Sequence, residues 1–227
     1  LLQVVNEPLH DPPDGPGEGN YMNALGGAGA SGWDWVIEAY TLARSYFPQT
    51  KLMINDYNIV NDIDNTNQYI DLIELLQAKD LIDAIGVQAH NYALQASAST
   101  IQANLDALAA TGLPVYATEF DLSGPTDAGH VSAYQRVFPV FWEHPGVMGV
   151  TLWGYRPGMW NSNTAYLLNP DGSERPSMEW LSDYVSSTGF DEDCILTTDQ
   201  TVDGARENNN EIIVYPNPTN DGRFVIG

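Results

Sequence analysis

Val4-Val5-Asn6-Glu7-Pro8 and Ala117-Thr118-Glu119-Phe120-Asp121 are the two stretches that decide the fold. Each is a short, largely apolar or β-branched run that leads directly into a glutamate, a pattern typical of a buried parallel strand. We therefore expect each glutamate where a strand stops and a loop begins. In a barrel of alternating strands and helices, that end of the strand faces the active site. The sequence thus predicts two carboxylates on opposite sides of one cleft, the pair that glycoside hydrolysis requires.

Strand and helix patterns alternate along the chain, which predicts βα units and a parallel sheet. The predicted strands are residues 1–5, 51–55, 84–87, 115–118 and 146–152, and the predicted helices are residues 33–47, 66–79, 99–110, 128–143 and 177–186. Polar or aromatic residues follow every strand, whereas a doubly wound sheet would gather them near one switch point. A barrel is therefore favoured. Five units cannot close the usual eight-stranded ring, so we expect three more upstream.

Composition narrows the classes of function that the chain could have. The 227 residues include 30 acidic and 8 basic side chains, a net charge of −22 that disfavours nucleic-acid binding and suits a neutral polysaccharide. No apolar run has the length of a membrane span, so membrane insertion is not expected. A single cysteine, Cys194, excludes an internal disulfide framework and multi-cysteine metal sites, and no histidine pair has ligand spacing. We expect no metal and no cofactor.

The chain divides into three parts. Residues 1–187 hold the βα units, 188–210 are polar and acidic as in a linker, and 211–227 look like the start of a small β-sandwich-like module. Because the chain opens at Leu1 inside a strand pattern and stops inside another, we interpret it as part of a longer protein.

Five motifs resemble, in chain order, those of glycoside hydrolase family 10, the retaining endo-β-1,4-xylanases with a (β/α)8 barrel. They are Val4–Pro8, Ile54–Asn58, Gly86–His90, Thr118–Asp121, and Leu152-Trp153-Gly154 with Trp160. The resemblance implies strands four to eight of the barrel, with Glu7 as acid/base and Glu119 as nucleophile. It also implies that Trp153 and Trp160 roof the glycone subsites, and that Tyr57 and Asn58 line the leaving-group subsite.

Physical roles fit these positions. Glu7 must hold a proton to donate to the leaving oxygen, and Asn6 can hydrogen-bond the sugar 2-hydroxyl. Glu119 must be ionised to attack, which His90 would support while Asp121 orients the imidazole. Gln88 joins His90 in the same motif and is expected to bind substrate. A retaining enzyme would place the two carboxyl groups about 5–5.5 Å apart.

Other interpretations compete with these roles. Within this motif we favour a site role for His90 over a purely structural one, and sugar stacking over core packing for Trp153 and Trp160. No role is assigned to His10, His130 or His144, and Trp33, Trp35, Trp142 and Trp180 are assigned to packing. The intact protein would be a xylan hydrolase. The alternatives are another retaining β-glycanase, such as a cellulase or mannanase, and a non-catalytic xylan-binding protein.

The end of the chain has a resemblance of its own. Residues 214–224, Val-Tyr-Pro-Asn-Pro-Thr-Asn-Asp-Gly-Arg-Phe, are similar to the start of the C-terminal sorting domain of the Bacteroidetes type IX secretion system. This implies a partnership with the secretion machinery and a secreted or cell-surface location. We expect a monomer that binds xylan or xylo-oligosaccharides. The loop from Gly154 to Trp160 departs from the commoner family sequence, and no role is found for Cys194.

Overall fold

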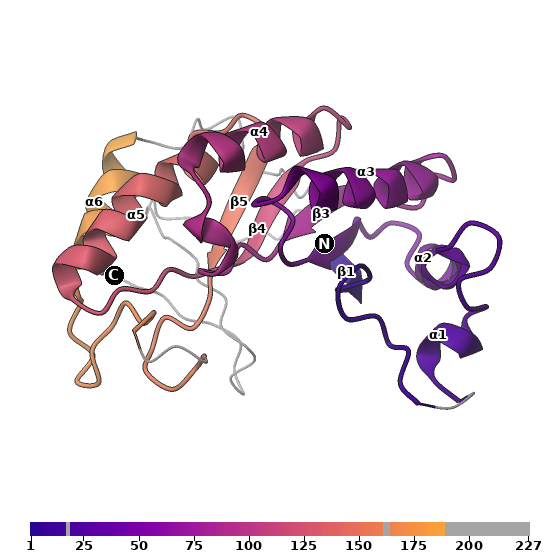
Figure 1. Cartoon of the computed structure of the whole chain (residues 1–227), viewed down its shortest axis with the longest axis horizontal. Coiled ribbons are helices and arrows are strands. Elements are labelled where there is room, and N and C mark those ends of the chain that lie inside the picture. The colour runs from indigo at the N-terminus through magenta and orange to yellow at the C-terminus, as the bar shows by residue number, and fades with distance from the viewer. Residues whose placement is uncertain (17–18, 161–163, 189–227) are drawn as a thin grey trace, which may run out of the picture.

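The computed structural model describes residues 1–16, 19–160 and 164–188, and in this part of the chain five parallel strands form one sheet (Figure 1). They are β1 (Leu2–Asn6), β2 (Leu52–Asp56), β3 (Ala84–Val87), β4 (Val115–Phe120) and β5 (Val147–Leu152). Each strand pairs with the next one along the chain. The predicted five βα units and parallel sheet are therefore confirmed.

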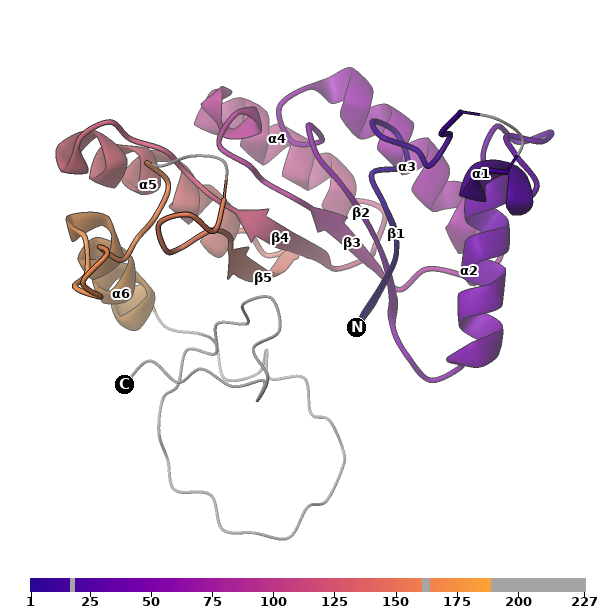
Figure 2. The ribbon, with the colours of Figure 1, turned by 90° about the horizontal axis from the view of Figure 1, so that it is seen from below.

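A helix follows each strand, and these helices form an arc around the outer side of the sheet, in chain order from α2 to α6 (Figure 2). They are α2 (Asp34–Tyr46), α3 (Ile63–Gln77), α4 (Ala98–Ala109), α5 (Asp127–Trp142) and α6 (Pro176–Thr188). Two short elements that the sequence did not predict, α1 (Tyr21–Ala24) and the 3-10 turn η1 (Ala93–Gln95), lie in strand-to-helix connections. Both connections belong to the edge of the sheet at which the strands end.

The core is centred on the middle of the sheet. Every residue of β2 and β3 is buried, and Tyr69 on α3 donates its hydroxyl to the carbonyl of Gly86 at 2.9 Å. Gly86 permits a close approach between strands, because a Cβ there would lie 2.7 Å from Asn55 Oδ1 and 2.8 Å from the Ile54 carbonyl. The sheet can therefore accommodate a polar asparagine side chain between β2 and β3.

Burial decreases toward the two edge strands of the sheet, β1 and β5. In β1 only Val5 is buried, and all of β5 is half-buried. The predicted linker begins at Thr188, which the structure places at the end of α6. The rest of that linker, the predicted β-sandwich-like module and Cys194 lie outside the described residues. Within the described residues, no helix is long and apolar enough to cross a membrane.

Candidate active site

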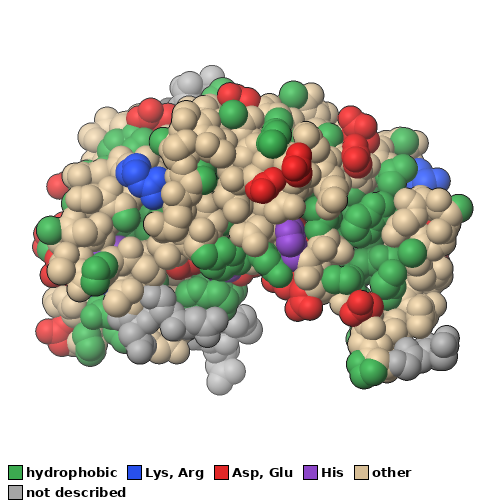
Figure 3. Space-filling view, viewed as in Figure 1, with side chains coloured by type: hydrophobic (Ala, Val, Ile, Leu, Met, Phe, Trp, Pro, Cys, Tyr) green, Lys and Arg blue, Asp and Glu red, His purple; other side chains and the backbone are tan. Residues whose placement is uncertain are grey.

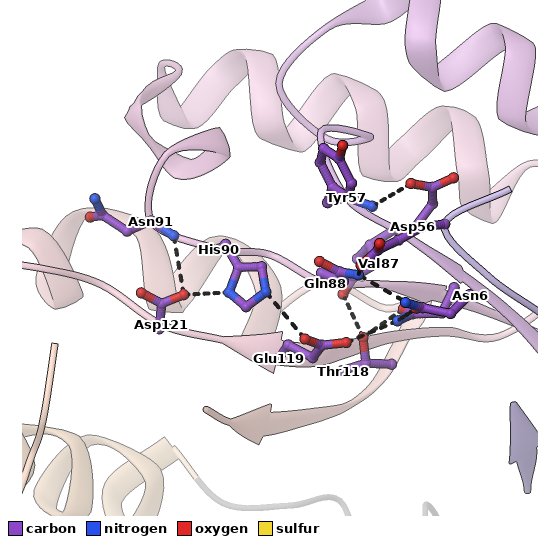
Figure 4. Close-up of polar contacts among 12 residues, drawn as sticks. Asn6, Asp56, Tyr57, Val87, Gln88, His90, Asn91, Thr118, Glu119 and Asp121 are labelled. Carbon is purple, nitrogen blue, oxygen red and sulfur yellow. Dashed lines mark hydrogen bonds and ion pairs between the residues drawn. The ribbon is translucent and has the colours of Figure 1, made fainter. Parts of the chain in front are cut away.

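The structure gathers the predicted catalytic and supporting side chains at the carboxyl ends of the strands. Glu7 follows β1, Gln88 and His90 follow β3, and Glu119 and Asp121 lie at the end of β4. The space-filling view shows the molecule hollowed on one side, with acidic and histidine side chains at the margin of the hollow (Figure 3). The close-up shows Asn6, Gln88, His90, Glu119 and Asp121 within one network of polar contacts (Figure 4), and Glu7 joins this network through Gln88.

Glu7 occupies a turn with an uncommon backbone conformation. Its φ is +55°, in the left-handed region that a residue other than glycine seldom adopts. Its backbone N–H donates to the Asn55 carbonyl at 2.8 Å, and its own carbonyl accepts from Asp11 at 2.9 Å. Gln88 Nε2 donates to Glu7 Oε1 at 2.5 Å. The carboxyl group is thus fixed by its own backbone and by a neighbouring strand end.

Glu119 lies inside β4 rather than after it, since the strand continues through Phe120. The sequence-based expectation that the strand would stop before this glutamate is wrong, because the Glu119 N–H still donates to the Gln88 carbonyl at 3.0 Å. The pairing of β4 with β5 shifts register between Ala117 and Phe120. Such irregularities beside active sites re-aim side chains. The Glu119 side chain is 15% exposed.

His90 bridges two carboxylates. Its Nδ1 lies 2.5 Å from Asp121 Oδ1 and its Nε2 lies 3.2 Å from Glu119 Oε2. Burial disfavours the charged imidazolium, but its hydrogen bonds to the two carboxylates, together with their negative charges, outweigh burial and raise the pKa of His90 to about 9. The imidazole is therefore cationic at neutral pH, and it holds a positive charge against Glu119. Asp121 is itself 2% exposed and also accepts from the Asn91 N–H.

Asn55 is a site residue that the sequence analysis did not single out. Fully buried on β2, it donates through Nδ2 to Asn6 Oδ1 at 2.9 Å and to Glu119 Oε1 at 3.1 Å. Its Oδ1 accepts from Thr118 Oγ1 at 2.6 Å. Asn6 Oδ1 also accepts from Gln88 Nε2 at 3.5 Å, so amide groups connect Glu7 to Glu119. The available signal was a polar residue at the end of an otherwise apolar strand.

Aromatic residues border the network. Trp160 stacks on His90 with ring centroids 4.7 Å apart, and Trp153 meets Trp160 edge-on at 6.1 Å. Gly154 has a φ of +63°, and a Cβ there would lie 2.5 Å from the Cβ of Trp160. Both tryptophans are half-buried, and the buried Trp153 Nε1 has no hydrogen-bond partner among the described residues. They border the site and do not lie in the closed core.

The strand end after β2 carries Tyr57 and Asn58. Tyr57 is half-buried, and its ring packs on His10 with centroids 4.6 Å apart. Asn58 has a φ of +53°, and its carbonyl accepts from Asn65 Nδ2. In the described part of the chain, Asn58 takes no part in the hydrogen bonds around the two glutamates.

The other histidines differ in their surroundings. His10, to which the sequence analysis gave no role, lies beside the site: its Nδ1 is 2.8 Å from Oδ1 of the buried Asp56. His130 contacts the Leu122 carbonyl and Ser177, and His144 contacts Asp106, so both connect structural elements. No group of three or more histidine, cysteine, aspartate or glutamate side chains suited to a metal ion occurs in the residues described.

Two glutamates at the carboxyl edge of a parallel sheet, held by amides and by a cationic imidazole, are a set of groups suited to acid–base and nucleophilic hydrolysis of glycosides. The family model "Glycosyl hydrolase family 10" matches residues 2–184, and the chain belongs to this family. The described sheet corresponds to the C-terminal part of its barrel.

Curated relatives agree with this assignment. The chain is 34% identical over 184 residues to endo-1,4-beta-xylanase B of Cellvibrio japonicus, covering 80% of this chain and 28% of that protein. It is 32% identical over 169 residues to endo-1,4-beta-xylanase A of Caldicellulosiruptor saccharolyticus, and the match covers 66% of this chain and 48% of that protein. The chain thus spans less than half the length of each of these two relatives.

Among solved structures, a family 10 protein from Paenibacillus barcinonensis superposes with a TM-score of 0.64 at 26% identity. The match covers 82% of this chain and 61% of that structure. The intracellular xylanase from Thermoanaerobacterium saccharolyticum gives a TM-score of 0.61 at 25% identity, and the match covers 77% of this chain and 55% of that structure.

Proposed function

We propose that the whole protein hydrolyses internal β-1,4-xylosidic bonds of xylan by a retaining double displacement, with Glu7 as acid/base and Glu119 as nucleophile. Family membership and relatives named as endo-1,4-beta-xylanases support the reaction class. The observation that carries the assignment of residues is the bridging of Glu119 by His90 and Asn55 while Gln88 holds Glu7.

The environments suggest how the two glutamates divide the chemistry. His90 and Asn55 contact the two oxygens of the Glu119 side chain and orient it as the nucleophile, whose carboxylate attacks the anomeric carbon. Glu7 gives its proton to the departing glycosidic oxygen, so the leaving sugar departs with a hydroxyl group. Glu7 then takes a proton from water, and the resulting hydroxide releases the sugar from Glu119 with net retention.

The remaining residues would bind the sugar chain. Asn6 and Gln88 present amide groups between the two carboxylates, where the sugar 2-hydroxyl lies in the transition state. Trp153 and Trp160 would stack on the glycone sugars, and Tyr57 and Asn58 would face the leaving group. The carboxyl separation of about 5–5.5 Å expected for retention belongs to the same proposal.

Hydrolysis by the whole protein, with Glu119→Ala and Glu7→Ala variants, tests this assignment. We expect reducing ends from xylan but not from cellulose or mannan, and no activity in Glu119→Ala. Azide should rescue Glu7→Ala on an aryl xyloside and give a β-xylosyl azide, since it needs no general base. Release from cellulose or mannan would favour another β-glycanase. Xylan binding without hydrolysis would favour the interpretation as a non-catalytic xylan-binding protein.

We also propose that residues 211–227 direct export by type IX secretion and that the exported protein is monomeric. Deleting these residues from the whole protein in a host with this secretion system should retain it in the periplasm. Secretion at the normal level without them would rule out this role.

A further inference from the structure

A buried arginine lies at the base of the connection from β5 to α6, the connection that carries both tryptophans of the site. The described limbs of this connection are residues 153–160 and 164–175, drawn in orange in Figure 1. Arg175 is 5% exposed and directly precedes α6. Neither the sequence motifs nor the proposed mechanism gives this residue a task.

The Arg175 guanidinium donates to three groups. Its Nη1 donates to the carbonyls of Thr164 at 3.0 Å and Tyr166 at 2.7 Å, and its Nε donates to Asp127 Oδ1 at 2.9 Å. Its Cζ also lies 4.7 Å from the centroid of the Tyr166 ring. Because Asp127 is the first residue of α5, the arginine fastens the returning limb of the connection to that helix.

The returning limb in turn holds the outgoing one. The N–H groups of Leu167 and Leu168 both donate to the Tyr155 carbonyl, at 2.9 and 3.0 Å. Tyr155 follows Gly154, and a Cβ at Gly154 would lie 2.5 Å from the Cβ of Trp160. The backbone beside Tyr155 therefore packs directly against the tryptophan.

A tight turn then leads to Trp160. The Met159 N–H donates to the Arg156 carbonyl at 3.3 Å, and Gly158, with a φ of +78°, follows a proline. Proline and glycine at the two central positions fit a type II turn, in which the proline ring fixes the first φ. The next residue after this turn is Trp160, which stacks on His90 with ring centroids 4.7 Å apart.

We propose that Arg175 is the positioning residue of this connection: by holding its returning limb on α5, it orders Trp153 and Trp160 at the glycone side of the site. This inference rests on the proposed xylanase function, and it concerns how tightly the sugars bind and not the bond-breaking step. Rings that are ordered before the sugar arrives do not have to be ordered on binding, so the affinity is higher.

The geometry calls for a guanidinium and not for a positive charge alone. An arginine has N–H groups on three separate nitrogens in a planar fork, whereas the three donors of a lysine lie on one atom. The Asp127 side chain is 58% exposed, so its ion pair with Arg175 is partly solvated and weak. The bonds to the two carbonyls therefore account for most of the positioning.

Steady-state kinetics of the whole protein on xylotetraose test this role. We expect Arg175→Met to raise KM about 5- to 20-fold and to change kcat less than about 2-fold, because it weakens binding that substrate and transition state share. Arg175→Lys keeps the charge and the fold, and should raise KM about 2- to 5-fold. Asp127→Asn should raise KM less than Arg175→Met does.

Arg44→Met is the matched control. Arg44 bonds the same two kinds of partner, the Thr50 carbonyl at 3.1 Å and Asp83 at 2.7 Å, but at the edge of the sheet where β2 begins. It should lower the melting temperature and leave KM unchanged. An unchanged KM in both Arg175 variants, or an equal rise in Arg44→Met, would overturn the positioning role while leaving the xylanase function in place. A wild-type protein that does not cleave xylotetraose would instead overturn the proposed function, and the positioning role with it.

Discussion

At the scale of single residues, the site depends on buried amides as much as on the two glutamates. Asn55 is fully buried and supplies hydrogen bonds to Asn6, Glu119 and Thr118 at once. A buried polar group is costly unless all its partners are present, so removing this side chain leaves several groups unsatisfied. Its importance comes from the number of groups it orients.

We predict that Asn55→Ala lowers kcat on xylan at least 10-fold and the free energy of unfolding by roughly 1–3 kcal/mol. Asn104→Ala is the matched control, because Asn104 is 2% exposed and bonds the Val60 carbonyl away from the site. The control should lose stability but retain kcat. Steady-state kinetics and urea unfolding of both variants make the comparison, and an Asn55→Ala enzyme with normal kcat would contradict it.

His90 gives a second prediction at this scale, from its pKa of about 9 in the folded protein against an ordinary 6.5. A raised pKa means that the folded state holds the proton more tightly. The stabilisation is therefore fully present below pH 6.5 and is lost as the pH rises toward 9. A shift of this size corresponds to roughly 3 kcal/mol as an upper limit.

The measurement is urea unfolding of wild type and His90→Asn at several pH values. The difference in unfolding free energy between them should shrink between pH 6.5 and 9. His130→Asn is the control: burial lowers the pKa of His130 from its ordinary 6.5, so well above that pH this histidine is neutral in both the folded and the unfolded state and its contribution should stay constant. A pH-independent difference for His90→Asn would refute the imidazolium assignment.

The sequence predicted some of the site residues and missed others. Glu7, Gln88, His90, Glu119 and Asp121 were predicted to share one site, and the structure brings them together. Asn55 and His10 were missed as site residues. Their positions depend on strand register and on loop conformation, neither of which leaves a periodic pattern in the sequence.

At the scale of elements, the connection after β1 determines the position of the acid/base candidate. Glu7 has a positive φ, and the residues that follow it are held by Asp56 at the end of β2. One Asp56 oxygen accepts from the Leu9 N–H at 2.8 Å, and the other contacts His10 Nδ1 at 2.8 Å and accepts from the Tyr57 N–H at 2.7 Å. One buried carboxylate therefore joins two loops across the cleft margin.

We predict that Asp56→Asn lowers both activity and stability, because an amide can accept on only one side where both carboxylate oxygens now accept. The loss should be roughly 1–3 kcal/mol in unfolding free energy. Asp71→Asn, at an exposed position of α3, should change neither property. Thermal unfolding and kcat/KM test the pair, and a fully active Asp56→Asn enzyme would show that the carboxylate does not hold the Glu7 turn.

Element boundaries were predicted less well than element types. Periodicity placed the start of α3 at Thr66, whereas the helix begins at Ile63, because Asp62 caps it through the N–H groups of Asp64 and Asn65. The short elements α1 and η1 contain too few residues to show a helical period. Capping chemistry, read along with periodicity, would have corrected the first error but not the second.

At the scale of the whole molecule, the order of the strands was predictable because each βα unit packs beside the one before it. The decrease in burial from the central strands to β1 and β5 was not predictable from the sequence. It depends on how the sheet curves and on which residues face its open edges. β1 and β5 terminate the sheet with partly exposed strands, and exposed strand edges pair readily with other chains.

Charge opposes such association, because the 227 residues carry a net charge of −22. The electrostatic screening length is about 10 Å at 0.1 M salt and about 3 Å at 1 M, so salt weakens this repulsion while leaving strand pairing and apolar contact intact. We therefore predict that the isolated 227-residue chain is dispersed at low salt and forms larger species as the NaCl concentration is raised.

Light scattering after size-exclusion chromatography at 50 mM and 1 M NaCl measures this change. The control is the whole protein, which we expect to be monomeric at both salt concentrations. If the isolated chain stays monomeric at both concentrations, the two terminal strands are protected by contacts other than charge repulsion, and the edge argument fails.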